Sequence, residues 1–292
     1  MITGITLLNY RERYTTKDFL KKRVLRILAP FLIWSGIYLV WRMFLGEVVL
    51  ESPMQVIRML AMNEINGVFW FFYVLFGLYL CIPVLSLVVN KEKVSVLYYL
   101  VLIWLVNVVA LPMLERFVGI PVLQGSGGVT IGVAFGYVGY LILGWLLHHI
   151  EIDRKQRGVI YILGLLSLVW MVAGTYLLNK KGAEGFDDFF MGYMSIDCIL
   201  LSIAVVVFFK TIPWDSILKP DGKLKKGIQA LARASFGVYL LQMLVIQVLQ
   251  ILLPIDPFSY RYMTVRAVLV YGVCVGITLV GQKMPGVRRA FP

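Results

Sequence analysis

Apolar residues gather in about eight continuous stretches of this 292-residue chain, each close to 20 residues long, with short polar connections between them. A helix rises about 1.5 Å per residue, so about 20 residues cross the ~30 Å hydrocarbon core of a bilayer. The apolar runs are continuous, whereas a membrane barrel needs short alternating segments, so the pattern favours helices over strands. The pattern predicts an all-α polytopic transmembrane bundle with spans over residues 27–45, 68–89, 95–114, 131–148, 158–178, 194–212, 236–253 and 265–284.

Composition supports a protein built inside a membrane. The chain is 60% hydrophobic and only 15% charged, whereas soluble domains are nearer 25% charged. No connection is long enough to fold alone. Residues 1–292 are therefore predicted to form a single membrane domain, with a basic amphipathic cytoplasmic segment (1–26), the bundle (27–284) and a cytoplasmic tail (285–292).

The distribution of Lys and Arg predicts the orientation. Residues 1–26 and alternate connections after them hold 21 of the 28 basic residues, and basic connections stay in the cytoplasm. Both termini are then cytoplasmic. The net charge of +12 is attributed to this topology, and nucleic-acid binding is not expected because no soluble fold carries a basic patch. Membrane lipid is the first predicted partner.

Residues 15–28 differ from the spans that follow. Apolar residues recur there at helical spacing among five Lys and Arg residues, Thr16 is a suitable helix cap, and Asp18 suits the first turn. Two interpretations stay open for this basic amphipathic helix. It contacts lipid headgroups, or it receives a phosphate-bearing donor.

Few polar residues stand out as candidates for chemistry. Adjacent His148 and His149 point about 100° apart on a helix and cannot form a metal pair, so they mark either a hydrated helix end or a proton shuttle. Asp197 enters the sixth predicted span. An acid within a span is a functional candidate, although its place near the outer end favours a hydrated side chain.

The cysteines and glycines favour structural roles. Three Cys residues scattered through apolar stretches predict neither a disulfide framework nor a metal site. The Gly-rich residues 124–128 lack the Lys of a phosphate-binding loop and are predicted to form a flexible connection. Small residues along the fourth predicted span permit close helix packing; they are Gly132, Gly136, Gly139 and Gly144.

Five stretches stand out, in order and over nearly the whole chain. The first is the basic segment at residues 17–34 with Arg23, Arg26 and Pro30. The others are the Trp-Phe-Phe-Tyr helix at 69–83, the Gly-Tyr…Leu-Gly helix at 135–144, the apolar helix at 202–210 that ends in Lys, and Ser-Phe-Gly-Val-Tyr-Leu-Leu-Gln at 235–242. Together these stretches resemble the integral-membrane acyltransferase family 3.

The resemblance implies O-acyl transfer, with acetyl the expected group, from acyl-coenzyme A as donor substrate to a cell-surface or lipid-linked glycan. No bound cofactor or metal is implied. Arg23 and Arg26 would hold donor phosphates, because the Arg guanidinium suits phosphate. Trp70 and Tyr73 would shape the acceptor side. Ser235, Tyr239 and Gln242 would line the passage and are the weak catalytic candidates.

Departures from the family pattern bear on activity. Family members carry a first span with an Arg and a catalytic His, and no such span is found here, where residues 1–8 resemble the end of the second span. Gln242 replaces a further family His. A glutamine cannot take the acceptor proton as a histidine can. The chain as given is therefore expected to be inactive or nearly so, either because the working protein is longer or because this is a degenerate relative.

Two functions from other classes stay open. Helix-breaking Pro83 and Pro112 and Gly-rich spans also suit a carrier or flippase for a lipid-linked sugar, although no inverted repeat is found. A non-catalytic membrane scaffold is the third possibility. The bacterial cytoplasmic membrane is the expected location.

Overall fold

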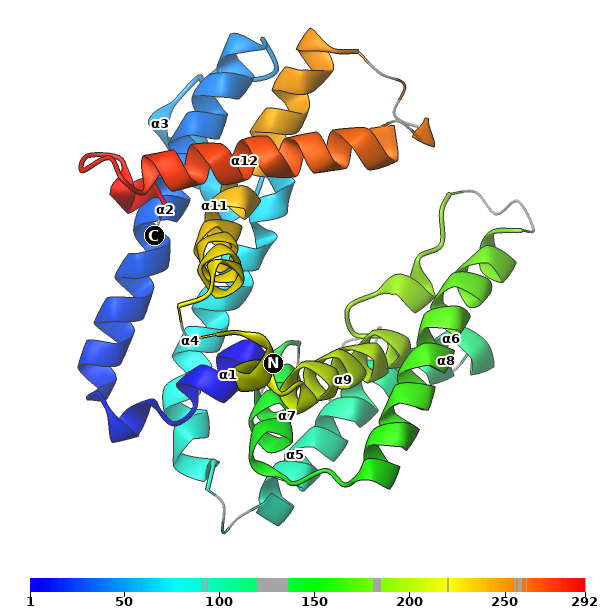
Figure 1. The fold of residues 1–292 in the computed structure, drawn as a ribbon. Coiled ribbons are helices and arrows are strands. Elements are labelled where there is room, and N and C mark those ends of the chain that lie inside the picture. The colour runs from blue at the N-terminus through cyan, green and yellow to red at the C-terminus, as the bar shows by residue number, and fades with distance from the viewer. Residues whose placement is uncertain are drawn as a thin grey trace. The chain divides into compact units, whose positions relative to one another are not determined.

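The computed structural model describes residues 1–90, 92, 94–119, 136–180, 185–219, 221–254, 256, 259–260 and 262–291. These residues are mostly helical and include no strand, which confirms the predicted all-α class (Figure 1). Seven of their helices are long and apolar enough to cross a bilayer: Thr16–Phe44, Gly67–Val88, Val94–Val118, Arg154–Asn179, Phe189–Thr211, Lys223–Leu252 and Met263–Gly281.

The fourth predicted span is the exception. Its described part is the 12-residue helix α7, Val138–His149, which covers only about 18 Å. Residues 131–135 of that prediction, including Gly132, lie outside the described residues, as does the Gly-rich stretch 124–128. The described chain therefore shows seven spanning helices and one shorter apolar helix where eight spans were predicted.

The predicted basic segment and the first span form one continuous helix, α2, Thr16–Phe44. The capping residue is Thr15 rather than the predicted Thr16. Its hydroxyl accepts a hydrogen bond from the Asp18 backbone N–H (3.2 Å) and donates one to the Asp18 carboxylate (2.7 Å). This reciprocal arrangement satisfies an N–H that the helix start leaves unpaired.

The chain divides into two compact units. Unit 1 comprises residues 1–19 and 78–212, and unit 2 comprises residues 20–77 and 213–292. The single membrane domain and the cytoplasmic termini stay predictions.

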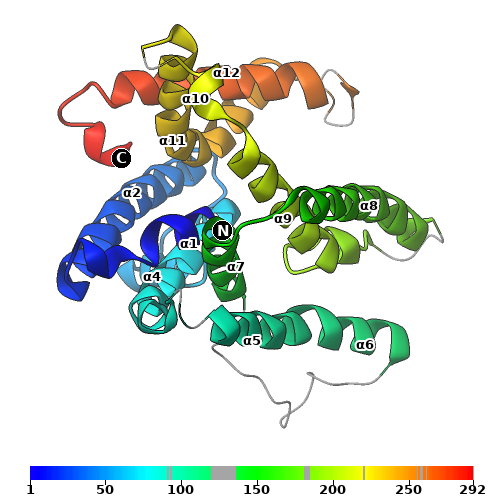
Figure 2. The same cartoon turned by 60° about the horizontal axis from the view of Figure 1, so that its bottom comes forward.

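Unit 1 is built around α7. Helices α1 (Ile2–Leu7), α5 (Val94–Leu105) and α9 (Ile196–Thr211) pack against it (Figure 2). Glycines permit these approaches: a Cβ on Gly4 would lie 2.0 Å from the Leu141 carbonyl oxygen, and one on Gly139 would lie 1.9 Å from the Trp104 ring. Close packing therefore occurs at Gly139, and also at Gly144, which meets the Met1 backbone, whereas a Cβ on Gly136 would meet nothing within 4 Å.

The remaining helices of unit 1 complete the apolar layer. Helix α8 (Arg154–Asn179) begins at a reciprocal cap between Asp153 and Gln156 and packs along α9. Helix α5 continues through a π-helical turn, Val106–Ala110, into α6 (Leu111–Val118). Because Pro112 cannot donate a backbone hydrogen bond to Val108, the regular helical ladder is interrupted at this turn.

Unit 2 holds α2 from residue 20 onward, α3 (Pro53–Ala61), the first part of α4 (Trp70–Val88), α10 (Trp214–Ile217), α11 (Lys223–Leu252) and α12 (Ala267–Gly281). Three aromatic residues on one face of α2 join it to the rest. Tyr38 donates to the Leu240 carbonyl (2.8 Å), and Trp41 donates to the Gln247 side chain (2.8 Å). Trp34 bonds the Ala290 carbonyl.

Helices α11 and α12 pack closely (Figure 1). Gly237 of α11 faces Thr278 of α12, where a Cβ on the glycine would lie 2.3 Å from the threonine methyl group. Two cavities of unit 2, described below, lie along this helix pair.

Candidate functional site

All seven site residues predicted from the sequence fall in unit 2; they are Arg23, Arg26, Trp70, Tyr73, Ser235, Tyr239 and Gln242. The structure does not gather them into one cavity. Arg26 lines a cationic cavity at one end of the α11–α12 pair, and Gln242 lines a second cavity farther along the same pair. The other five line neither.

The cationic cavity has a volume of about 820 Å³, within the range of small-molecule sites. Its basic residues come from four segments: Arg26 from α2, Arg233 from α11, Lys283 from the turn after α12, and Arg288 from the C-terminal 3-10 turn. The other lining residues are Ala232, Phe236, Leu279, Gln282 and Phe291.

A folded-back C-terminus positions Arg288 at this cavity. Phe291 is buried, lies edge-on against Trp34 with ring centroids 5.4 Å apart, and covers Gly281. The Trp34 ring N–H donates to the Ala290 carbonyl at 2.9 Å. These contacts hold the turn Arg288–Ala290 beside α2 and α12, so a residue far from Arg26 in sequence lines the same cavity.

The positive charges of the four basic side chains are not neutralised by acidic residues in the cavity lining. No lining residue is acidic, and none of the four basic side chains makes a salt bridge to an acid among the residues that the structure describes. Gln282 donates to the Arg233 carbonyl (3.1 Å) and so ties α12 to α11 at the cavity wall. An anion with several negative oxygens matches this arrangement.

Only one of the two arginines predicted to hold the donor phosphates lines the cationic cavity. Arg26 lines the cationic cavity, while half-buried Arg23, one helical turn earlier, does not. In the sequence, Arg233, Lys283 and Arg288 served only as evidence for which connections are cytoplasmic. Their proximity to Arg26 depends on contacts between distant segments, and no local pattern signals it.

The predicted passage residues face one side of α11 but differ in surroundings. Ser235 is exposed and donates to the Ala232 carbonyl of its own helix (2.7 Å). Tyr239 donates to the Val68 carbonyl at 2.6 Å, which joins α11 to the start of α4. Its ring stacks on Phe236 of the cationic cavity, with centroids 6.1 Å apart.

Trp70 and Tyr73 lie at the start of α4. Trp70 contacts the neighbouring Phe71 ring edge-on. Tyr73 donates to the Leu60 carbonyl of α3 and meets Phe31 of α2 edge-on, with centroids 5.6 Å apart. These contacts make Tyr73 a brace between helices, and its predicted role toward an acceptor stays a prediction.

Gln242 lines a cavity of about 550 Å³ with Arg266, a residue that sequence reasoning missed. Arg266 ends the π-helical turn Tyr262–Arg266 and is only 5% exposed. One feature of the sequence could have identified Arg266: it is an arginine within a stretch that is otherwise apolar enough to cross a membrane. Because Arg266 lies at the end of the predicted span, it could not be distinguished from an ordinary cation at the membrane interface.

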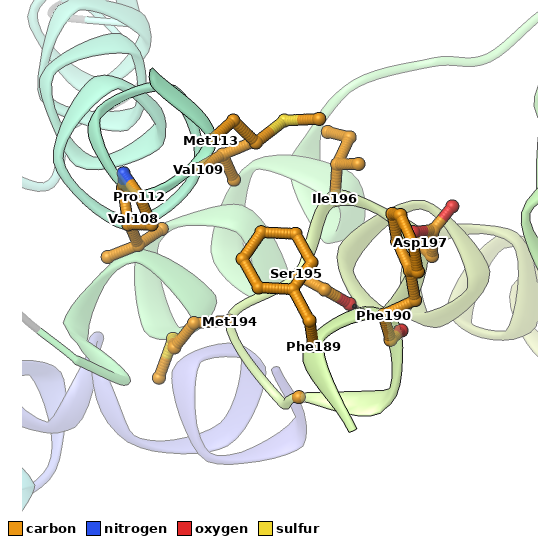
Figure 3. Close-up of a pocket in the computed structure, with 11 residues that line it drawn as sticks. Val108, Val109, Pro112, Met113, Phe189, Phe190, Met194, Ser195, Ile196 and Asp197 are labelled. Carbon is orange, nitrogen blue, oxygen red and sulfur yellow. Dashed lines mark hydrogen bonds between the residues drawn. The ribbon is translucent and has the colours of Figure 1, made fainter. Parts of the chain in front are cut away.

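Unit 1 has a separate, mainly apolar cavity of about 200 Å³ (Figure 3). Val109 and Met113 form one wall, and Phe189 and Ser195 before α9 form the other. Asp197 lines it and is 4% exposed, which corrects the expected hydrated position, and its Oδ2 has no hydrogen-bond partner among the described residues. None of the seven predicted site residues lies in unit 1 with this cavity.

The two histidines also lie in unit 1, at the end of α7. His149 stacks on Trp145 with ring centroids 4.0 Å apart, and its Nδ1 is 2.9 Å from the Trp145 carbonyl oxygen. Lys210 of α9 donates to three carbonyls of this helix end, so the contacts here are those of a helix terminus. The proton-shuttle interpretation stays a prediction.

Comparison with known proteins supports an acyltransferase. No curated protein and no solved structure matches the chain. The Acyl_transf_3 family model, described as an acyltransferase domain, matches residues 1–281. This match covers nearly the whole chain and agrees with the seven spanning helices. The chain is therefore an integral membrane protein and belongs to the integral-membrane acyltransferase family 3.

Proposed function

We propose that this protein transfers an acyl group, acetyl in the simplest case, from acyl-coenzyme A to a hydroxyl of a cell-surface or lipid-linked glycan in the bacterial cytoplasmic membrane. Membership of the acyltransferase family supports acyl transfer as the general reaction. The cationic cavity is the single observation that supports this donor. Coenzyme A carries a diphosphate and a sugar phosphate, and the cavity offers four basic side chains without an acid among its lining residues.

The cavity suits such a donor in both charge and size. Arg26, Arg233 and Arg288 carry planar guanidinium groups, which bind phosphate oxygens through paired hydrogen bonds. Phe236 and Phe291 add apolar surface beside them. The charge count predicts that this end of the helices is cytoplasmic, where acyl-coenzyme A is available.

In the proposed reaction the acceptor oxygen bonds to the acyl carbon, the thioester C–S bond breaks, and the sulfur leaves with the electron pair. The acceptor proton ends on this sulfur, so that coenzyme A is released as the free thiol. None of Ser235, Tyr239 and Gln242 is a base at neutral pH, and turnover by the chain as given is therefore expected to be slow. Tyr239 and Ser235 are proposed to line the passage, and Trp70 and Tyr73 the acceptor side.

The first prediction concerns donor binding. Acetyl-coenzyme A binding to the protein in lipid nanodiscs is measured by titration calorimetry. Arg26→Gln and Arg288→Gln are each expected to weaken binding about tenfold, because each removes a charged hydrogen-bond donor worth about 1.5 kcal/mol or more. Coenzyme A without its sugar phosphate should bind more weakly to the wild-type protein.

Two neighbouring arginines provide matched controls. Arg289→Gln and Arg23→Gln remove the same charge from residues that do not line the cavity, and both should bind the donor nearly as the wild type does. If Arg288→Gln and Arg289→Gln weaken binding equally, the cavity is not the donor site. Radiolabelled acyl transfer to glycan, compared with acyl-independent sugar flux in vesicles, separates the transferase from a carrier.

A further inference from the structure

The second cavity on the α11–α12 pair has a different character from the cationic cavity. Its volume is about 550 Å³, and its polar walls are Gln242 and Arg266. Apolar and aromatic side chains form the remainder; they are Val238, Ile246, Met263, Ala267, Val270 and Tyr271. A charge enclosed by apolar surface inside a membrane segment marks a functional site by default.

Arg266 is held in one orientation by α11. Its guanidinium donates to the Gln250 side-chain oxygen and to the Ile246 carbonyl (3.1 Å). The π-helical turn that ends at Arg266 is a distortion often found at functional sites. A guanidinium fixed in this way needs little reorganisation to bind a second group.

Gln242 adds an open hydrogen-bonding group to the same cavity. Its side chain is half-buried and makes no hydrogen bond to any residue that the structure describes. A glutamine amide offers two donors and one acceptor. Together with the guanidinium it provides donors from two helices toward one cavity, which suits the several oxygens of a phosphate group.

The two cavities of unit 2 lie toward opposite ends of α12. Arg266 precedes this helix and Gln282 follows it, so about 24 Å of helix separates them, close to the hydrocarbon thickness of a bilayer. Met263 and Tyr271, which line the second cavity, are 60% and 46% exposed. Exposed apolar residues in a membrane-spanning helix face lipid, so a lipid headgroup has access here.

We propose that Arg266 and Gln242 form a second anion site, distinct from the donor cavity, which binds the phosphate group of a membrane lipid. Its walls favour a ligand with a negative head and an apolar body over a small soluble ion. This inference goes beyond the proposed acyl transfer, and binding here requires no acyl donor. Its failure would therefore leave the donor assignment untouched.

Lipid binding tests the second anion site directly. The full chain is purified in a neutral detergent, without acyl-coenzyme A, and titrated with phosphatidic acid while bound lipid is counted by native mass spectrometry. The wild type should bind one phosphatidic acid in preference to phosphatidylcholine. Arg266→Gln should weaken that binding about tenfold or more, because it removes a charged donor.

Further variants separate this site from general electrostatic attraction. Arg58→Gln removes an equal charge from an exposed position on α3 that lines neither cavity and should leave binding unchanged. Gln242→Leu, which keeps Arg266, should weaken binding severalfold, so the test survives if Arg266→Gln does not fold. Arg266→Lys should bind with intermediate affinity.

The proposal is overturned if Gln242→Leu binds phosphatidic acid as tightly as the wild type, or if Arg58→Gln weakens binding as much as Arg266→Gln. Inorganic pyrophosphate tests whether the site binds a soluble phosphate instead of a lipid headgroup. If it displaces the lipid at equal concentration, the site binds soluble phosphate and the lipid assignment is wrong.

Discussion

At the residue scale, Lys210 shows how a basic residue serves structure rather than substrate. Its ammonium donates to the carbonyls of Leu147 (2.7 Å), His148 (3.1 Å) and Ile150 (2.7 Å). The last carbonyls of α7 lack partners within the helix, and a cation at a helix C-terminus is favourable. A single side chain therefore caps α7 and joins it to α9.

Replacing Lys210 tests this role. Lys210→Met keeps the aliphatic stem but removes the charge and three hydrogen bonds, and should destabilise the protein by about 1–2 kcal/mol, allowing for solvent exposure. Tryptophan fluorescence during thermal unfolding in detergent measures the loss. Lys210→Arg should retain most of the stability, and so should Lys219→Met, which removes an exposed charge elsewhere. An unfolding midpoint unchanged in Lys210→Met would contradict the capping role.

Site residues were predictable from sequence only where their signal is local. Arg26 could be proposed because basic residues recur at helical spacing before a span. Arg288 could not, because Trp34 and Phe291 bring it to the cavity from the far end of the chain. Arg266 was missed for another reason: its burial depends on packing of α11 against α12, which hydropathy does not encode.

At the element scale, Gly237 gives a physical reason for the Ser-Phe-Gly-Val-Tyr stretch. A Cβ there would lie 2.3 Å from Cγ2 and 2.4 Å from Oγ1 of Thr278. At such distances the Thr278 side chain or the helices themselves must shift, and Thr278 is fully buried. The same two helices carry Arg233 and Gln282, whose hydrogen bond connects them at the cationic cavity.

Gly237→Ala is expected to destabilise the protein by about 1–3 kcal/mol through overpacking and to weaken acetyl-coenzyme A binding by displacing the cavity walls. Thermal unfolding and donor titration measure the two effects. Gly276→Ala is the matched control, since a Cβ there meets nothing within 4 Å and alanine favours a helix. Thr278→Ala should partly rescue Gly237→Ala. An equal loss in both glycine variants would disprove the close-contact explanation.

At the scale of the whole molecule, hydropathy predicted the helices well because each apolar run is a local property of the chain. Each of the seven long helices covers one of the eight predicted spans, although the helices Thr16–Phe44 and Lys223–Leu252 begin well before the predicted starts at residues 27 and 236. The division into two units was not predicted, since it depends on contacts such as that between Trp34 and Ala290. Charge statistics predict which ends are cytoplasmic, and that inference rests on sequence alone.

The last prediction concerns this orientation, on which the supply of donor to the cationic cavity depends. Single cysteines at Asn90, Asp221, Glu51 and Asp188 sample both units. They are introduced after Cys81, Cys198 and Cys274, all free thiols, are replaced by alanine. Since basic connections stay inside, an impermeant maleimide should label Glu51→Cys and Asp188→Cys in intact cells. It should label Asn90→Cys and Asp221→Cys only after permeabilisation.

If Asn90→Cys and Asp188→Cys react from the same side, the topology fails. If Asp221→Cys reacts from outside, the start of α11 and the cavity beside it face away from cytoplasmic acyl-coenzyme A, and the proposed donor cannot reach its phosphate site.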